Sequence, residues 1–318
     1  DVLAARERLA PYLAPTPLRH HPTLDLAIPG TSLLVKHENV QPTGSFKVRN
    51  GLATVTSLGA AERAAGVVGA TTGNHGLGLA FAGRQLGVPV TICVPRGNNP
   101  EKNAALRAWG ATVVEEGADY DEAAAVAQRI VESEGRVLAH STNNVNVLAG
   151  AGTMTLEIVE QLGEGGALDV LLIAVGGGSQ AVGAMTVARA LRPELEIIGV
   201  QAAGAPAAHD GWHARAPRTT ERASTFAEGV ATRSTYPFTF PSLLDGLADF
   251  VTVTDAEIAD AVRVILSGTH HLVEGAGAMG FAAARKIAPR LQGRRTGIIF
   301  CGGNLDTTVL RRILNREL

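Results

Sequence analysis

One of the few lysines in this chain lies in a setting that suits covalent chemistry. Lys47 follows a Pro-Thr-Gly-Ser turn in QPTGSFKVRN (41–50), just inside an expected helix. Because the N-terminal end of a helix is partly positive, an ammonium there is disfavoured relative to the neutral amine. A neutral lysine amine is a nucleophile toward carbonyl compounds. On these residues alone, an ordinary surface lysine is the alternative.

The other three lysines are weaker candidates. The 28 basic residues include only four lysines, and the remaining ones are Lys36, Lys102 and Lys286. Lys36 lies in an expected strand, whereas Lys102 and Lys286 lie on amphipathic helices beside polar residues. Any chemistry that needs a lysine amine therefore points first to Lys47.

A glycine-rich turn offers a place for an anion. Gly176, Gly177 and Gly178 lie between a buried strand and a helix that begins at Ser179. Glycines let the backbone approach a phosphate closely, and the helix start supplies N–H groups. A merely tight turn is the alternative. Ala181 breaks the GxGxxG pattern and GxxxxGK[ST] is absent, so neither a dinucleotide site nor a triphosphatase loop is supported.

Three further segments follow expected strands. TTGNHG (71–76) offers the polar groups of Thr71, Thr72, Asn74 and His75, which suit a carboxylate or a phenolic oxygen, although an N-cap turn would look similar. CGGN (301–304) carries Cys301, which by itself is more typical of a buried core thiol. VEGAGAMG (273–280) carries Glu274 in a loop of small residues.

A metal site is not predicted. His209 and His213 would share a face if HDGWH (209–213) were helical, which is the spacing of a metal-binding pair. The surrounding segment is interrupted by glycine and proline, and no third ligand has suitable spacing.

These segments need elements that bring strand ends together. Short apolar strands alternate with helices, which predicts an α/β fold with parallel-rich sheets flanked by helices. Strands are expected at 31–38, 66–71, 89–95, 111–116, 137–141, 169–178, 195–202, 249–253 and 295–304. Helices are expected at 45–59, 75–87, 99–110, 120–135, 148–163, 179–194, 254–270 and 277–293. In such sheets ligands bind beyond the carboxyl ends of the strands.

The order of elements also predicts two domains. Residues 66–141 hold four strands and three helices in succession, so we expect a small inserted domain at 56–143. Residues 1–55 and 144–318 would form the large domain. The stretch 203–247 has clustered Pro, His, Arg and Thr and is expected to be irregular and functional.

Composition excludes several classes of protein. With 46% hydrophobic residues and a net charge of −2, the chain is neither disordered nor basic enough to predict nucleic-acid binding. No run of 18 apolar residues occurs, so no membrane span is expected. Two distant cysteines, Cys93 and Cys301, do not make a disulfide framework, which favours the cytoplasm.

Taken in order, the motifs resemble those of the fold-type II pyridoxal-phosphate-dependent serine/threonine dehydratase and serine racemase family. The resemblance covers nearly the whole chain through ENVQPTGSFKVRN, TTGNHG, NPEKNAALRAWGA, LAGAGT, VGGGS, VEGAGAMG and CGGN. It implies a two-lobe fold like that of the tryptophan synthase β chain, pyridoxal 5'-phosphate as cofactor, a small amino-acid substrate and a homodimer.

The resemblance also assigns roles. Lys47 would attach the cofactor and later move the α-proton, Phe46 would pack on the ring and Asn74 would bond its 3'-oxygen. The phosphate would lie on Gly176, Gly177, Gly178 and Ser179. Glu274 would belong to the cofactor site, and Cys301 would face the ring nitrogen, where the family usually has serine. The substrate carboxylate would be held by Thr71, Thr72, Asn74 and His75.

Some positions depart from the family's pattern. Racemases place a serine opposite the lysine, and Thr72 stands there in this chain, which puts racemisation in doubt. The family's cation site uses two carboxylates where this chain has Gln201 and Ala207, so no cation is expected. No regulatory domain is expected after Leu318.

The leading hypothesis is therefore an ammonia-lyase that converts a β-hydroxy amino acid such as serine or threonine to an α-keto acid and ammonia. The neutral thiol of Cys301 at the ring nitrogen suits prompt loss of the leaving group. A racemase or a β-replacement enzyme of the same fold is the second hypothesis, and a non-catalytic amino-acid or phosphate-binding protein is the third. The side chain of the substrate is not fixed, although FAEGVATR (226–233) is expected to border its pocket.

Overall fold

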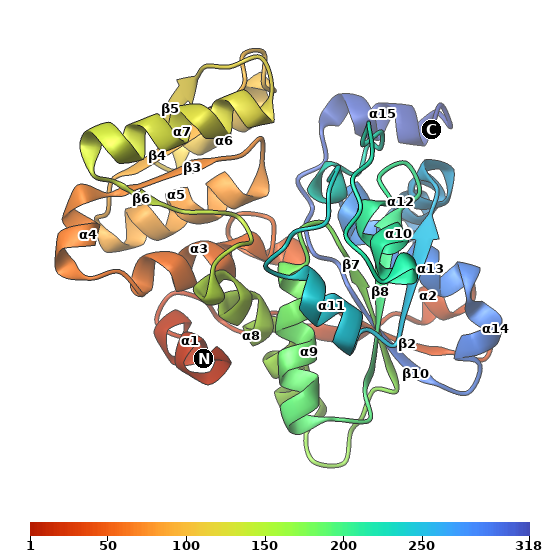
Figure 1. Ribbon diagram of the computed structural model, residues 1–318. Coiled ribbons are helices and arrows are strands. Elements are labelled where there is room, and N and C mark those ends of the chain that lie inside the picture. The colour runs from red at the N-terminus through yellow and green to blue at the C-terminus, as the bar shows by residue number, and fades with distance from the viewer. The chain divides into compact units, whose positions relative to one another are not determined.

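Two compact units make up the chain in the computed structural model, which describes all 318 residues (Figure 1). Unit 1 comprises Asp1–Ala14 and Phe46–Thr153, and unit 2 comprises Pro15–Ser45 and Met154–Leu318. The predicted inserted segment 56–143 lies within unit 1, and the predicted domain boundaries at 55/56 and 143/144 remain predictions. Helix α8 (Val145–Leu162) runs from one unit into the other.

Unit 1 contains a parallel four-stranded sheet in the order β5-β4-β3-β6. The strands are β3 (Val67–Ala70), β4 (Val90–Val94), β5 (Thr112–Glu115) and β6 (Val137–Leu138). The helices are α1 (Val2–Leu9), α3 (Lys47–Thr56), α4 (Ala60–Ala65), α5 (Asn74–Leu86), α6 (Pro100–Ala108) and α7 (Tyr120–Glu134).

The two faces of this sheet bury different helices. Val67 and Ile92 belong to a core shared with residues of α1, α3, α5 and α6. Their neighbours Val68 and Cys93 point the other way, into a core shared with α7. Since successive strand residues face opposite sides, strands buried on both sides read as continuous apolar runs, which makes them recognisable in the sequence.

Unit 2 contains a six-stranded sheet in the order β1-β2-β10-β7-β8-β9. The strands are β1 (Leu18–His20), β2 (Ser32–Lys36), β7 (Val170–Ala174), β8 (Glu196–Ala202), β9 (Asp249–Val253) and β10 (Arg295–Ile299). All neighbours are parallel except β1 and β2, which are antiparallel. The parallel-rich α/β fold predicted from the sequence is therefore confirmed.

The helices of unit 2 surround this sheet, and α13 packs against four of its strands. They are α2 (Pro22–Asp25), α9 (Ser179–Leu191), α10 (Ala207–Ala214), α11 (Phe240–Gly246), α12 (Asp255–Thr269), α13 (Gly275–Lys286), α14 (Ala288–Leu291) and α15 (Thr307–Leu314), with short 3-10 turns η1 (Glu38–Val40) and η2 (Glu228–Val230). Local signals set several ends. Thr254 caps α12 in a reciprocal capping box with Glu257, and Asn99 caps α6 in unit 1.

Several sequence-based boundaries were wrong. The helix predicted at 277–293 begins at Gly275 and ends at Lys286, and Pro289 lies at the start of the separate α14 because proline lacks an N–H for a continuing helix. The strand predicted at 137–141 is only Val137–Leu138. The stretch 203–247 is not wholly irregular, since it contains α10 and α11. The antiparallel strand β1 was missed because three residues carry almost no periodic signal.

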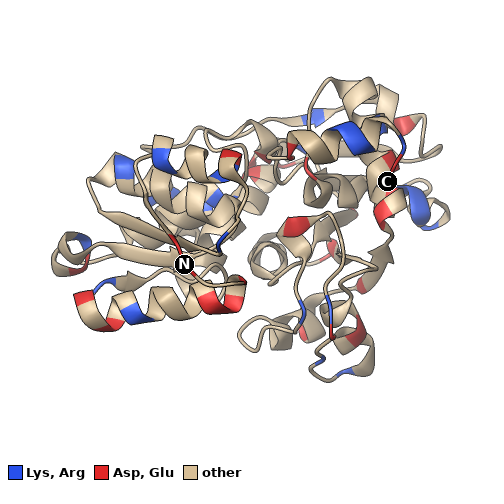
Figure 2. Cartoon of the chain, turned by 90° about the horizontal axis from the view of Figure 1, so that it is seen from above, with Lys and Arg blue, Asp and Glu red and all other residues tan.

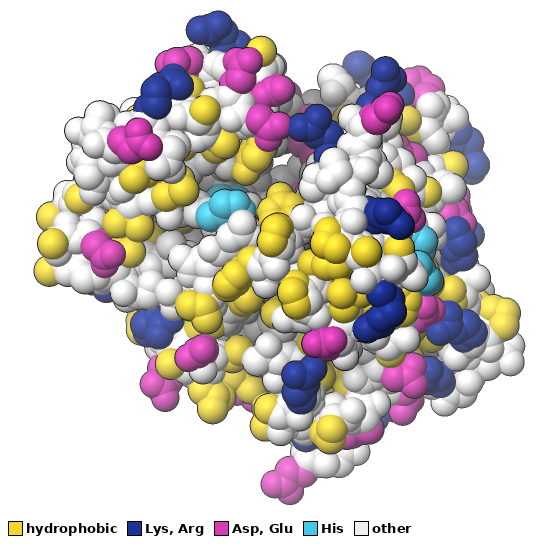
Figure 3. All heavy atoms as spheres, in the orientation of Figure 1, with side chains coloured by type: hydrophobic (Ala, Val, Ile, Leu, Met, Phe, Trp, Pro, Cys, Tyr) yellow, Lys and Arg dark blue, Asp and Glu magenta, His cyan; other side chains and the backbone are white.

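The surface is mixed in charge and polarity. Basic and acidic residues are interspersed in Figure 2, and neither sign forms a continuous stripe in that view. Figure 3 shows apolar side chains gathered over α11, and the preceding Phe238 is among the exposed large hydrophobic residues. None of the helices is long and apolar enough to cross a membrane.

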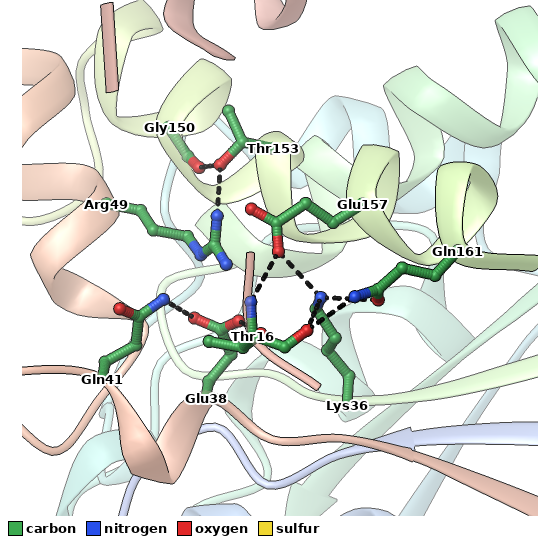
Figure 4. Close-up of polar contacts among 9 residues, drawn as sticks. All are labelled: Thr16, Lys36, Glu38, Gln41, Arg49, Gly150, Thr153, Glu157 and Gln161. Carbon is green, nitrogen blue, oxygen red and sulfur yellow. Dashed lines mark hydrogen bonds and ion pairs between the residues drawn. The ribbon is translucent and has the colours of Figure 1, made fainter. Parts of the chain in front are cut away.

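A buried ion pair occupies one of the four lysines. Lys36, the last residue of β2, donates from Nζ to Glu157 Oε2 at 2.7 Å, to the Thr16 carbonyl at 2.7 Å and to Gln161 Oε1 at 2.9 Å (Figure 4). Lys36 is fully buried and Glu157 nearly so. Three acceptors satisfy the three protons of the ammonium, so Lys36 is a structural lysine rather than a reactive one.

This pair predicts an asymmetric response to mutation. Glu157→Gln leaves the Lys36 ammonium buried without a countercharge and should destabilise the protein by about 3–5 kcal/mol in denaturant unfolding. Glu115→Gln is a matched control, because Glu115 pairs with Arg107 at 2.6 Å but at half-exposed positions, and it should cost less than about 1 kcal/mol. Equal effects of the two substitutions would contradict this account.

Candidate active site

Lys47 is the first residue of α3, as the sequence predicted. Its Nζ donates to the Ser141 carbonyl at 3.4 Å and lies 5.0 Å from the centroid of the Phe46 ring. Phe46 is the N-cap residue of α3 and is buried. The amine is therefore at the positive end of a helix, with one aromatic face and one backbone carbonyl as neighbours within unit 1.

Glycines set the backbone of α3 directly against α5. A Cβ on Gly78 would lie 2.2 Å from the Lys47 carbonyl oxygen, and a Cβ on Gly51 would lie 2.2 Å from the Gly78 carbonyl oxygen. A further glycine acts on α8, where a Cβ on Gly150 would lie 2.7 Å from the Arg49 carbonyl oxygen. No side chain larger than hydrogen fits at these points, so α3 is fixed between two helices by backbone contact.

Arg49 adds a polar tie to the same packing. Its side chain is buried, and Nη1 donates to Thr153 Oγ1 of α8 at 3.2 Å (Figure 4). Thr153 Oγ1 in turn donates to the Gly150 carbonyl at 2.6 Å. The residue two positions after Lys47 is thus anchored, which fixes the start of α3.

The loop between β3 and α5 carries the second group of predicted residues. Gly73 N–H donates to Thr71 Oγ1 at 3.1 Å, which shapes the turn that presents Thr72 and Asn74 at the start of α5. The first N–H groups of a helix have no acceptor within the helix, so this end of α5 suits an anion such as a carboxylate.

His75 has a structural contact that its motif did not reveal. Its Nε2 donates to the Ala139 carbonyl at 2.8 Å, and its Nδ1 is buried without a hydrogen-bond partner. Burial, and then the charge of Lys47, lower the pKa of His75 to about 3, so the ring is neutral. The imidazole therefore ties the loop to the end of β6, and the predicted substrate contact of His75 remains a prediction.

The glycine turn lies in unit 2, between β7 and α9. Gly178 has a φ of +93°, which glycine adopts without strain, and a Cβ there would lie 3.0 Å from Thr239 Oγ1. Thr239 Oγ1 donates to the Gly177 carbonyl at 2.6 Å. A Cβ on Gly176 would lie 2.6 Å from the Gly229 carbonyl oxygen. The turn is thus shaped by residues of η2 and by Thr239, none of which has a local sequence signal.

Glu274 and Cys301 belong to the same group of contacts in unit 2. The Glu274 N–H donates to the Gly302 carbonyl at 3.0 Å, and a Cβ on Gly302 would lie 2.6 Å from Glu274 Oε1. Cys301 directly precedes Gly302 and is buried. A Cβ on Gly229 would lie 3.7 Å from Glu274 Oε1. The structure therefore brings residues 176–178, 229, 274 and 301–302 together beyond the ends of β7 and β10.

These residues fit a phosphorylated cofactor that attaches to a lysine. The turn at 176–178 admits no side chain, and it precedes the N-terminus of α9, whose first N–H groups suit a phosphate. Gln180, in the first turn of α9, has a buried Nε2 without a hydrogen-bond partner, which is a donor available to an added acceptor. In unit 1, Lys47 supplies the amine.

Comparison with known proteins decides the class. Residues 9–302 match the family described as pyridoxal-phosphate dependent enzyme. The chain belongs to this family. The predicted cofactor, pyridoxal 5'-phosphate, is thereby confirmed.

The relatives of this pyridoxal-phosphate-dependent enzyme include ammonia-lyases and a racemase. An L-threonine ammonia-lyase of Thermotoga maritima is 35% identical over 100% of this chain and 78% of the relative. An L-threo-3-hydroxyaspartate ammonia-lyase of Pseudomonas sp is 35% identical over 96% of this chain and 95% of the relative. A serine racemase of Schizosaccharomyces pombe is 31% identical over 96% and 94%.

Solved structures agree in fold. A threonine deaminase from the organism abbreviated T.th. has a TM-score of 0.91 and 34% identity, covering 96% of this chain and 97% of that one. A maize serine racemase has a TM-score of 0.92 and 28% identity, covering 99% and 96%. The predicted fold type and the predicted class, a pyridoxal-phosphate-dependent ammonia-lyase rather than a non-catalytic binding protein, are confirmed.

The contact between α3 and α5 predicts that Gly78→Ala is harmful. Replacing a mid-helix glycine with alanine ordinarily stabilises a helix by about 1 kcal/mol. Here the added Cβ would meet the Lys47 carbonyl, so we expect a loss of about 1–3 kcal/mol of stability and displacement of Lys47.

Denaturant unfolding and the visible absorbance of the bound cofactor measure the two effects of Gly78→Ala. Gly165→Ala is the control, because a Cβ there would meet nothing within 4 Å. A Gly78→Ala protein with the stability and cofactor absorbance of the wild type would contradict the proposed constraint.

Proposed function

We propose that this enzyme removes water from a β-hydroxy amino acid and releases an α-keto acid and ammonia. The observation that carries the proposal is Lys47, an amine fixed at the N-terminus of α3 by the backbone contact with α5 and backed by the Ser141 carbonyl. The ammonia-lyases among the relatives support the same reaction.

When bound, pyridoxal phosphate supplies an electron sink that makes the α-hydrogen of the substrate acidic. The residues of this chain would do the rest. Lys47 would hold the cofactor covalently, yield to the substrate amine and then accept the α-proton at Nζ. The Ser141 carbonyl would hold the resulting ammonium. The β-hydroxyl group would leave as water, and water would later release ammonia from the product to give the keto acid.

The remaining predicted residues would orient the cofactor and the substrate. Phe46 would pack on the cofactor ring, and Asn74 would donate to its 3'-oxygen. The phosphate would be held by Gly176, Gly177, Gly178 and Ser179, with Glu274 in the same cofactor site. Cys301, a neutral and weak donor, would face the ring nitrogen. The substrate carboxylate would be held by Thr71, Thr72, Asn74 and His75.

Two kinds of substrate are favoured by the relatives. The names of the relatives include threonine and 3-hydroxyaspartate, which share the β-hydroxyl group and differ in the group beyond it. Segment η2 touches the glycine turn through Gly229, which supports the expected role of 226–233 at the substrate side chain. We propose a substrate of this class and leave its side chain to direct measurement.

The test combines a substrate screen with a variant. Serine, threonine, 3-hydroxyaspartate and phenylserine should be assayed for keto-acid release, and at least one should react. Lys47→Ala should lower kcat by a factor of about 10² to 10⁴ or more and abolish the covalent cofactor absorbance. Lys36→Met is the control lysine variant, and it should leave that absorbance in whatever fraction folds. Wild-type protein that binds no pyridoxal phosphate would overturn the proposal.

Racemisation is a second candidate activity, favoured by the serine racemase among the relatives. A racemase needs a second proton carrier on the other face of the substrate, and Thr72 is the residue of this chain that would serve. If the enzyme interconverts D- and L-serine, Thr72→Ala should abolish the interconversion while sparing most keto-acid release. Thr72→Ser should preserve both activities. Equal loss of both in Thr72→Ala would argue against a separate role for the hydroxyl.

The assembly and location of the enzyme are part of the same proposal. We propose a homodimer in the cytoplasm. Two free and buried cysteines, Cys93 and Cys301, support a reducing compartment. Burial raises the pKa of the Cys93 thiol to about 11, which makes it an inert core residue. The state of assembly is measured directly by sedimentation of the purified enzyme.

A further inference from the structure

The segment after β6 forms a turn beside the Lys47 amine. Ala139 fixes its entry, because the Ala139 N–H donates to the Val68 carbonyl at 2.8 Å and its own carbonyl accepts from His75 Nε2 at 2.8 Å. The next residue, His140, begins the turn. Both anchors lie in the same unit as Lys47, so the turn has a fixed position relative to the start of α3.

The imidazole of His140 closes this turn. Its Nδ1 accepts the Thr142 N–H at 3.0 Å and the Asn143 N–H at 2.9 Å. These are the bonds that an asparagine or aspartate side chain makes in an Asx turn. Burial, and then the charge of Lys47, lower the pKa of His140, so the neutral ring keeps the lone pair on Nδ1.

The residue held inside the turn is Ser141, whose carbonyl accepts the Lys47 ammonium at 3.4 Å. The Ser141 side chain is hydrogen-bonded to Tyr120 at the start of α7. Ser141 is therefore held through its side chain by α7 and through its backbone by the His140 turn. The titratable groups of unit 1 that face the Lys47 amine are His75 from α5 and His140, and both rings are neutral.

We infer that His140 is a positioning residue for the Lys47 amine: through Nδ1 it shapes the 140–143 turn so that the Ser141 carbonyl receives the ammonium. The role rests on the proposed function of Lys47 as the proton carrier. A carbonyl held at this place stabilises the protonated amine, which is the form that Lys47 takes after it removes the α-proton. Tyr120 contributes by holding the same residue.

Two substitutions separate the turn from the rest of the imidazole. Asparagine Oδ1 is attached to Cγ, as Nδ1 is in histidine, so His140→Asn keeps an acceptor for the two N–H groups and removes Nε2. Glutamine places its polar atoms one bond further out, so His140→Gln loses the turn acceptor and keeps a polar atom near the position of Nε2. The two variants have similar size and no charge, which makes each the control for the other.

The first measurement uses the cofactor-loaded enzyme and its best substrate. His140→Gln should lower kcat about tenfold with little change in KM, because the turn acts on the proton at Lys47 and not on the substrate carboxylate. His140→Asn should recover most of the wild-type kcat. Loss of activity in both variants, or loss in His140→Asn alone, would show that the imidazole acts through Nε2 and would overturn the inference.

The second measurement does not depend on turnover. In the full-length chain freed of cofactor, acetic anhydride labels lysine amines only when they are unprotonated, and mass spectrometry reports the rate at Lys47. Without the Ser141 acceptor the ammonium is less stable, so His140→Gln should label about threefold faster than wild type at a fixed pH, and His140→Asn should label at the wild-type rate. Lys286, at the far end of α13, is the internal reference and should not change.

The outcomes also distinguish this inference from the proposed function. If the wild type binds no pyridoxal phosphate, the proposed function fails regardless of the variants. If all three proteins bind it and label Lys47 at equal rates, the function stands and the positioning role is wrong. If His140→Gln does not fold, as judged by the loss of cooperative unfolding, His140→Asn decides alone: labelling at the wild-type rate supports the role, and faster labelling overturns it.

Discussion

The close contact of three helix backbones at α3 is the constraint on which the candidate site of unit 1 depends. Gly78 of α5 and Gly150 of α8 bring these helices against the carbonyls of Lys47 and Arg49, at distances that leave no room for a Cβ. Such contact excludes side-chain rearrangement as a way to move α3, because backbone meets backbone. The position of the Lys47 amine is therefore a property of packing, and the polar tie from Arg49 to Thr153 holds the same arrangement.

Electrostatics then separate the lysines by role. Lys36 has lost its reactivity to a complete set of buried acceptors that includes Glu157, whereas Lys286 pairs with Glu257 at the surface. Lys47 has a long bond to a backbone carbonyl within unit 1, with two neutral histidines nearby. A weakly held amine at a helix N-terminus can exchange a proton and a covalent partner, and a saturated buried ion pair cannot.

Unit 2 meets a different demand, the binding of a dianion without a cluster of cationic side chains. Gly176–Gly178 and the N-terminus of α9 offer N–H groups instead of charges. Segment η2 and Thr239 shape the turn from outside, and Glu274 packs against Gly302 at the end of the neighbouring strand. The glycine content of the chain follows from these contacts, since each place where two backbones or a backbone and a side chain meet closely excludes a Cβ.

The sequence by itself determined the fold class, the order of strands and helices from Val67 to Leu138, and the candidate lysine. These features rest on local periodicity, caps and glycine motifs, which neighbouring residues encode. It did not reveal β1, α10 or α11, which are short or lie in a composition typical of loops, nor the interruption after Lys286. Only the tertiary structure decided that His75 is tied to Ala139, that the Ser141 carbonyl faces Lys47 and that Gly229 shapes the glycine turn. Each of these contacts joins residues about 50 or more positions apart, and no local pattern can record a partner at that distance.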